Sequence, residues 1–372
     1  FTIDTDGARL NRGTNAGPDQ EFLFDFKDTT IINQGHCRTF WMSIDKENHI
    51  IRCGKGYLMK SLQLFEVIID KDEWNTTGYG NLVDYSMSAF AQDNKVQLIT
   101  SKYPIYDDLP PLVKSQDEIT LDDLDQNTAI TIYELSPECR RLYSNVAGKN
   151  VQLNTKDFPD FSDAIEYSIN TPSMICHTKL KEKTNEFVGT TTTTEPDPKM
   201  TYLRITLGAN KGDSPGIPYV MEIWPAGYYS PIHDHAQCNA IIKVLSGSLT
   251  ARYFAGLSPD DTKGPFHKAV VSEGDVTWLD DRQFQTHQLY NHSKDGGEDG
   301  LSCVTIQCYL YNDNDNSHYE NFDYSIGGDD KIYQFVPGSD WDLDTFKEII
   351  RKEWTAYLLT KTPFNFRPVG NV

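Results

Sequence analysis

The chain has 372 residues, a hydrophobic content of 38%, an aromatic content of 12% and 25 glycines, which is typical of a folded protein rich in β-structure and not of a disordered one. Its formal net charge of −20 at pH 7 argues against nucleic acids and anionic membranes as partners, because their phosphates would be repelled. No apolar run approaches the roughly 20 residues that span a bilayer.

The seven cysteines form no CxxC motif, so they describe neither a disulfide framework nor a zinc knuckle. A reducing compartment fits this usage, and we expect a cytoplasmic protein. The sequence begins at Phe1 rather than Met, which leaves open whether a leader was removed. At this length we expect about two domains and a connecting region. The predicted boundaries are 1–106, 107–198 and 199–372.

Residues 1–106 contain short aromatic or β-branched runs separated by Gly, Asn and Asp: FLFDF, CRTFWMSI, HIIRCGKGY, LQLFEVIID and VQLIT. Such runs without a helical period predict a β-sandwich-like domain. The segment FWMSIDKENHIIRCGKGY, residues 40–57, is similar over about one hairpin to the farnesoic acid O-methyltransferase-like β-domain, a module often attached to other proteins. The resemblance brings no catalytic residues, so this region is an accessory domain for which docking of a protein partner stays open.

Residues 107–198 begin with DDLPPLVKSQDEITLDDLDQN, whose carboxylates and paired prolines indicate an acidic linker. Thr120 is a predicted N-cap for a helix that begins at LDDL. Apolar positions at helical spacing predict further helices over 136–147 and 160–187, the second interrupted by Pro172.

Residues 199–372 return to strand patterns, in TYLRITLG, PYVMEIWP, TARYF, HKAVV, VTWL, HQLYN and SCVTIQCYLY. Ser339 is the predicted N-cap of a terminal helix, which we expect to pack on the outside of a barrel. Its apolar face would consist of Trp341, Phe346, Ile349, Ile350 and Trp354.

The stretch GYYSPIHDHAQCNAIIKVLSG, residues 227–247, carries His233 and His235 with one residue between them. Side chains two apart in a strand share a face, so both imidazoles should point toward one place. His287 follows after a glycine turn as a third ligand. Three imidazoles with an open side suit a catalytic iron, copper, nickel or zinc ion.

These residues resemble the cupin family, small antiparallel β-barrels that hold a metal in the barrel mouth. The pattern G-x5-HxH-x3,4-E-x6-G is met except at its glutamate, where Ala240 stands, and the end of the second pattern, H-x3-N, is also met. The matching residues are Gly227, His233, His235, Gly247, His287 and Asn291. Without the glutamate, the site resembles the three-His thiol dioxygenases, and within them cysteine dioxygenase.

The resemblance to cysteine dioxygenase covers about residues 199–325 and implies several roles. TYLR places Arg204 where the family has the arginine that grips the substrate carboxylate. SCVTIQCYLY places Tyr309 at the active-site tyrosine, expected to donate a hydrogen bond to O2 or to the substrate carboxylate. Gln307 replaces the usual histidine and interrupts the family's Ser-His-Tyr relay. Ser230, three residues before the first histidine, joins them as a substrate-binding residue.

The resemblance further implies Fe(II) as the cofactor, with a small thiol and O2 as substrates. Ala240 stands where mammalian members have a cysteine crosslinked to the tyrosine, so we expect no crosslink. Three neutral imidazoles leave Fe(II) its full charge, which favours a thiolate ligand, and addition of O2 to sulfur gives a sulfinate. L-cysteine is the expected substrate; a mercapto acid or cysteamine, and a non-catalytic cupin binding or assembly module, are the alternatives.

Overall fold

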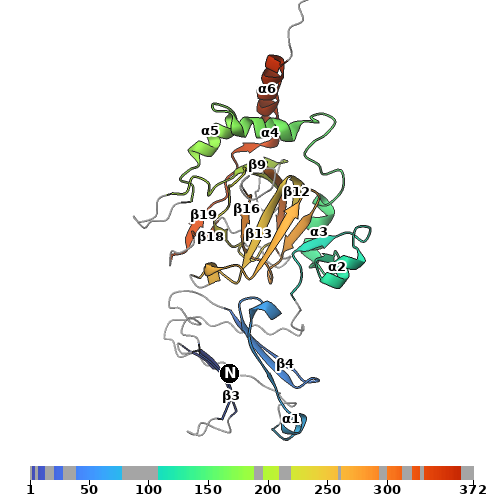
Figure 1. Ribbon diagram of the computed structural model, residues 1–372, viewed down its shortest axis with the longest axis vertical. Helices are drawn as coiled ribbons and strands as arrows, with labels where there is room; N and C mark the ends of the chain where they lie inside the picture. Colours follow the sequence, from blue (N-terminus) through green and yellow to red (C-terminus); the bar gives the residue numbers. More distant parts are fainter. Residues whose placement is uncertain are drawn as a thin grey trace, which may run out of the picture. The chain divides into compact units, whose positions relative to one another are not determined.

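The computed structural model describes residues 2–4, 7–12, 21–27, 39–77, 108–187, 196–208, 219–258, 261–292, 300–311, 321–326 and 331–361. The chain divides into two compact units, Phe1–Asp108 and Leu109–Val372 (Figure 1). The run VQLIT, expected as a strand, lies outside the described residues.

The N-terminal unit contains two three-stranded antiparallel sheets. The first has the order β1(Thr2–Asp4), β2(Gly7–Arg12), β3(Glu21–Lys27), and the second β4(Phe40–Asp45), β5(Ile50–Lys55), β6(Gln63–Ile68). A short helix, α1(Lys71–Thr77), follows the second sheet. One apolar cluster joins Leu10 of the first sheet to Ile51 and Phe65 of the second. The two sheets therefore share a core, as in a β-sandwich.

Two larger sheets form the C-terminal unit. The eight-stranded sheet has the order β20-β9-β10-β17-β12-β15-β7-β8, with bounds Trp341–Asp342, Leu203–Leu207, Tyr219–Trp224, Cys303–Leu310, Asn239–Ser246, Val276–Leu279, Leu112–Lys114 and Ala129–Thr131. The six-stranded sheet has the order β14-β13-β16-β11-β18-β19, with bounds His267–Ser272, Ser248–Phe254, Thr286–Tyr290, Ile232–His233, Phe322–Ser325 and Tyr333–Phe335.

Most neighbouring strands are antiparallel, but β7 pairs with β8 and β20 with β9 in parallel. The segment 107–198 therefore supplies two strands to the eight-stranded sheet in addition to helices. Both strands are only three residues long and lie in an acidic, proline-containing stretch, so their sequence carries little strand pattern.

Four helices accompany this segment: α2(Leu121–Gln126), α3(Pro137–Val146), α4(Phe161–Asn170) and α5(Ile175–Glu182). Thr120 caps α2 as predicted, because its Oγ1 accepts the N–H of Asp123 at 3.1 Å. The predicted interruption near Pro172 is confirmed by the break between α4 and α5.

The terminal helix, α6(Leu343–Lys361), begins later than predicted, and Ser339 is not its cap. Asp342 Oδ1 accepts the N–H of Thr345 at 2.9 Å. The preceding Trp341 pairs with Ile205 in the parallel strand β20. This pairing extends the sheet through two residues that the sequence assigns to the helix.

The helices cover the outer face of β9 and β10. In Figure 1, α4 and α5 lie across one end of the strands of this unit, next to α6. Strand alternation directs Leu203 and Ile205 into a core shared with Phe161 of α4 and Phe346 of α6. Arg204, between the two apolar residues, points to the opposite face, toward the space between the two sheets.

Gly247, the last glycine of the metal-strand motif, is required by the backbone. Its φ is +74°, and a Cβ at this position would lie 2.8 Å from the carbonyl oxygen of Ser302. Only glycine meets both conditions without displacing the neighbouring strand. None of the described helices combines the length and apolarity that a membrane crossing needs.

Candidate metal centre

Two of the three predicted histidines face each other across a strand pair. His233 of β11 and His287 of β16 are direct antiparallel partners. Directly opposed residues place their side chains a few ångströms apart on the same face of a sheet. The sheet register therefore brings together two of the three imidazoles, from residues 54 positions apart in the sequence.

His235 reaches the cluster differently from the prediction. The strand ends at His233, and His235 starts a tight turn in which Ala236 and Gln237 have φ values of +49° and +64°. The N–H of Cys238 donates to the carbonyl of His235 at 3.0 Å and closes this turn. A turn, not strand alternation, directs the second imidazole inward, because two consecutive left-handed residues reverse the chain before β12.

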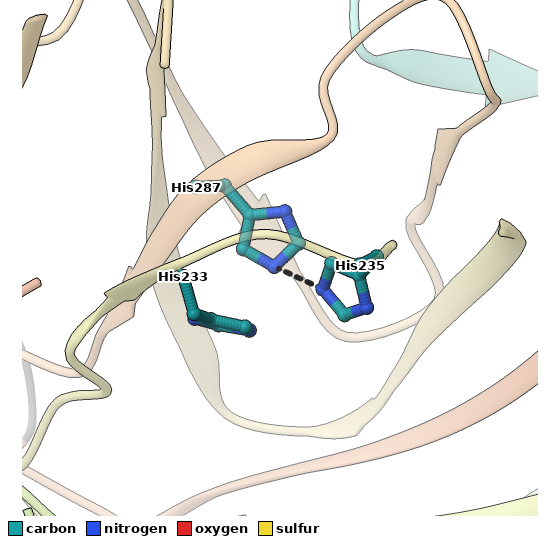
Figure 2. A group of neighbouring side chains, drawn as sticks. All are labelled: His233, His235 and His287. Atoms are coloured by element: carbon teal, nitrogen blue, oxygen red, sulfur yellow. Dashed lines mark hydrogen bonds between the residues drawn. The ribbon is translucent and has the colours of Figure 1, made fainter. Parts of the chain in front are cut away.

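The three imidazoles converge (Figure 2). One nitrogen from each ring lies within 4.8 Å of the others. The Nε2 atoms of His235 and His287 are 3.3 Å apart. Among the described residues, the group able to hold an ion contains these imidazoles and no carboxylate.

Backbone carbonyls orient two of the rings. Nδ1 of His233 lies 3.1 Å from the oxygen of Pro231, and Nδ1 of His287 lies 3.3 Å from that of Phe284. With the proton on Nδ1, each Nε2 presents a lone pair to the cluster, which is the arrangement common for metal-binding histidines. Nδ1 of His235 is buried and has no partner among the described atoms.

Burial keeps the rings neutral. It lowers the pKa of His233 to about 4 and of His287 to about 3, and places that of His235 well below its usual value. Neutral imidazoles are ready to bind a metal without first losing a proton. A site of three nitrogen donors fits a divalent iron, copper, nickel or zinc ion.

The cluster lines a small cavity between the two sheets of the unit. The cavity has a volume of about 20 Å³. This size restricts the occupants to an ion and small molecules. One wall is formed by the eight-stranded sheet together with Tyr202, the residue before β9. Its lining residues are Tyr202, Arg204, Glu222, Trp224, Gln307 and Tyr309. Opposite it lie the three imidazoles with Leu289, Phe322, Phe335 and Pro337.

Arg204, Gln307 and Tyr309, all predicted from the sequence, thus lie around one cavity with the imidazoles. Ser230 is not among the lining residues. Its Oγ accepts the N–H of Leu289 at 3.0 Å, and its own N–H donates to the carbonyl of that residue. Ser230 therefore holds the chain before β11 against β16.

Glu222 was not predicted, and it is the one carboxylate among the residues that line this cavity. It lies directly opposite Arg204 in β9, and its Oε1 is 3.5 Å from the arginine Nε. Gln307 Nε2 donates to its other oxygen. Burial raises the pKa of Glu222 to about 7, against the opposing effect of Arg204. The signal in the sequence is a glutamate in the apolar run YVMEIW, in phase with the buried Trp224.

Gln307 connects this carboxylate to the tyrosine. Its Oε1 accepts the hydroxyl hydrogen of Tyr309 while its amide nitrogen donates to Glu222. The Tyr309 ring stacks on His235, with 5.7 Å between centroids. Gln307 therefore orients the tyrosine. Ala240 lies directly opposite Tyr309 in the strand pair, and its methyl group offers no sulfur for a crosslink.

Asn291 of the H-x3-N motif and its neighbour His292 have structural contacts. Asn291 is buried, and its Nδ2 donates to the carbonyls of Trp224 at 2.7 Å and Leu301 at 3.0 Å. This amide joins β16 to β10 and to the start of β17. His292 contacts Thr250 Oγ1 at 2.6 Å and belongs to no metal-binding group among the described residues.

Comparisons with known proteins give distant likenesses to solved cupin structures over part of the chain. No family model and no curated protein matches the sequence. The Cupin_2 domain of an XRE family transcriptional regulator from Enterobacter cloacae matches at 12% identity and a TM-score of 0.23, covering 30% of this chain and 97% of that one.

An oxalate oxidase in complex with glycolate, a substrate analogue, matches at 15% identity and a TM-score of 0.24, over 34% of this chain and 59% of its own. A DMSP lyase from Ruegeria pomeroyi matches at 15% identity and a TM-score of 0.22, over 31% of this chain and 49% of its own. These are likenesses of fold alone. The sheets and the C-terminal helix of the structure confirm the strand-rich architecture that the sequence predicts.

Proposed function

We propose that the protein is a non-haem iron dioxygenase that adds both atoms of O2 to the sulfur of a small thiol. L-cysteine, converted to cysteine sulfinate, is the first substrate to test. The observation that carries this proposal is a buried cluster of three neutral imidazoles, without a carboxylate, in a cavity that also contains Arg204 and Tyr309. Three neutral nitrogen ligands do not offset the charge of a divalent ion, so the ion attracts a thiolate more strongly than it would with a carboxylate ligand.

The reaction balances without a further cofactor. The thiol RSH and O2 give the sulfinic acid RSO2H, so sulfur loses four electrons and the two oxygen atoms gain them. Iron(II) held by His233, His235 and His287 would bind both the thiolate and oxygen, as this transfer requires.

The remaining lining residues position the substrate and exclude water. Arg204 Nη1 donates to the carbonyl of Pro337 at 2.7 Å, which fixes the guanidinium plane in the cavity wall. A guanidinium in fixed orientation suits a substrate carboxylate. Phe322 and Phe335 form an apolar wall beside the imidazoles. Tyr309 donates its hydroxyl hydrogen to Gln307, which departs from the expected donation to O2 or to the substrate carboxylate. In this arrangement its oxygen can only accept a hydrogen bond from the cavity.

The test is reconstitution of the full chain with Fe(II) without oxygen, followed by L-cysteine and isotopically labelled O2. The expected product is cysteine sulfinate with both labelled oxygen atoms, seen by mass spectrometry. Full iron loading without sulfinate from L-cysteine, a mercapto acid or cysteamine would overturn the proposal.

Arg204→Ala identifies the thiol class. If the substrate carries a carboxylate, this change lowers kcat/KM for L-cysteine far more than for cysteamine, which lacks that group. Loss of one charge-assisted bidentate contact costs about 1.5–3 kcal/mol, or about 10- to 150-fold. An equal loss for both thiols points to a substrate without a carboxylate.

The second candidate is a non-catalytic cupin that serves as a binding or assembly module. It is favoured by the ion pair between Arg204 and Glu222, because the guanidinium expected to bind a substrate carboxylate is already paired with a carboxylate of the protein. Metal analysis separates the two: a dioxygenase binds one iron per chain after reconstitution, whereas a module without bound iron supports the second candidate.

A further inference from the structure

Glu222 differs from the other polar residues of the cavity because it brings a negative charge to the group expected to bind substrate. Its side chain is almost fully buried. One oxygen faces Arg204 Nε at 3.5 Å, and the other accepts the amide hydrogen of Gln307. In the sheet it lies opposite Arg204 on one side and Thr305 on the other.

The charges around Glu222 come from few groups. Arg204 of β9 is the nearest cation, and Lys183, which follows α5, acts from farther away. The ammonium of Lys183 is itself held by Asp340 at 3.2 Å and Glu186 at 3.3 Å. Tyr202, Tyr309 and the three imidazoles line the same cavity and are neutral at ordinary pH, because burial raises the pKa of both phenols and lowers that of the imidazoles.

A substrate carboxylate at Arg204 would place two carboxylates on one buried guanidinium. Two like charges that share a site cannot both stay ionised at low cost, so one of them takes up a proton. Glu222 is the carboxylate placed to do so, because it is buried within the sheet and fixed by Gln307.

We propose that Glu222 is a specificity-determining residue that takes up one proton when a thiol with a carboxylate binds Arg204. This inference rests on the proposed function. The cavity would then bind L-cysteine or a mercapto acid together with one proton. It would bind a thiol that has no carboxylate, such as cysteamine, with no uptake of a proton.

The pH dependence has a definite sign. The pKa of Glu222 is raised to about 7 in the free protein. Above this pH Glu222 is ionised, so binding of a carboxylate requires a proton from solution, and affinity falls up to about tenfold per pH unit. Below it Glu222 is already protonated, and the affinity becomes nearly independent of its titration.

The experiment uses the full chain loaded with Fe(II) in the absence of oxygen, titrated with L-cysteine and with cysteamine by calorimetry. Repeating each titration in buffers of different ionisation enthalpy gives the number of protons exchanged. At about pH 8.5, L-cysteine should take up about one proton more than cysteamine, and at about pH 5.5 this difference should vanish.

Glu222→Gln, which resembles the protonated side chain, should remove the difference at the higher pH and raise the affinity for L-cysteine about tenfold or more. Glu186→Gln is the matched control, because Glu186 pairs with Lys183 and Thr201 and does not line the cavity. It should leave the difference in place. The wild-type difference at the two pH values tests the proposal even if Glu222→Gln fails to fold.

The outcomes separate the two proposals. If both thiols bind the iron-loaded protein with the same proton count at about pH 8.5, or if Glu222→Gln leaves the difference unchanged, the role of Glu222 is wrong and the proposed function stands. If folded Glu222→Gln protein no longer binds iron, Glu222 supports the metal site and its assigned role is overturned. If neither thiol binds the iron-loaded protein, the proposed function itself fails.

Discussion

At the scale of single residues, each imidazole of the cluster depends on what holds its other nitrogen. The Pro231 and Phe284 carbonyls set the proton of two rings on Nδ1, leaving Nε2 for a metal. These carbonyls belong to the backbone immediately before each histidine, so the orientation is a local property of the chain. Substitutions at the histidines should therefore lower the metal affinity more than they lower the stability of the fold.

His287→Ala should lower the affinity for Fe(II) by more than about 100-fold, because two imidazoles cannot hold the ion as three do. Competition with a chelator of known affinity measures the effect. His292→Ala is the matched control, since His292 contacts Thr250 and lies outside the cluster. Equal iron affinity in the two variants would exclude His287 as a ligand.

At the scale of elements, the turn that carries His235 is held by one side chain of the neighbouring loop. Gln285 Oε1 accepts the N–H of Gln237 at 2.8 Å, and its Nε2 donates to the carbonyls of Cys238 at 2.7 Å and Asp280 at 2.6 Å. These bonds join the His235 turn to the segment that leads to His287. Gln285 thus fixes the distance between two ligands that belong to different elements.

Gln285→Leu should weaken Fe(II) binding about 10- to 100-fold, the usual range for residues that position metal ligands, and should broaden the spectroscopic signature of the bound metal. Gln283→Leu is the matched control in the same loop, because Gln283 is equally buried and its side-chain oxygen has no partner. If Gln285→Leu binds iron as the wild type does, the turn keeps its shape without this amide.

The first turn of α2 is fixed by a buried carboxylate. Asp123 accepts hydrogen bonds from both Thr120 and Thr128, and both of its oxygens accept from Lys114 Nζ at 2.8 and 2.9 Å. The Lys114 ammonium and the two hydroxyls hold the pKa of Asp123 well below its usual value. A lowered pKa stabilises the fold above the unfolded value of about 4, and this contribution is lost as the pH falls.

Asp123→Asn should therefore lower the Tm at pH 7 by roughly 2–4 °C, and the deficit should shrink as the pH falls below about 4. Thermal unfolding followed by circular dichroism measures both effects. The exposed Asp122 provides the control, and Asp122→Asn should leave the Tm nearly unchanged. A deficit that persists in acid would indicate that packing, rather than charge, holds α2.

At the scale of the whole molecule, the sequence predicted the strands and the three histidines because local patterns encode them. The HxH spacing, the apolar alternation and the required Gly247 can all be read from neighbouring residues. The shape of the His235 turn could not be read, because left-handed φ at Ala236 and Gln237 belongs to residue types that usually avoid it.

What the sequence did not predict depends on strand register. Glu222 and Arg204 are 18 positions apart in the sequence, and only the pairing of β9 with β10 brings them together. The short strands β7 and β8 form because the sheet offers them an edge, not because of their own composition. Ser339 failed as a cap for the same reason, since β20 pairs with β9 before α6 can begin.

These long-range contacts predict where the chain can be divided. A fragment of residues 109–372 should fold and bind one Fe(II) per chain with the affinity of the full chain, because its core and its imidazoles lie within one unit. A fragment of residues 199–372, which starts at the boundary expected from composition, should be insoluble or bind no iron.

The shorter fragment lacks two sets of contacts. It loses Phe161 and Ile165 of α4, which are fully buried against Leu203 and Ile205, and each buried side chain of this size contributes about 1.5–3 kcal/mol. It also loses β7 and the carbonyl of Pro110 that accepts the Trp278 indole N–H at 3.2 Å. Circular dichroism, chemical denaturation and iron stoichiometry compare the two fragments. Equal unfolding midpoints would mean that residues 109–198 do not contribute to the stability of the two sheets. Loss of iron binding in 109–372 would mean that the metal site depends on residues 1–108.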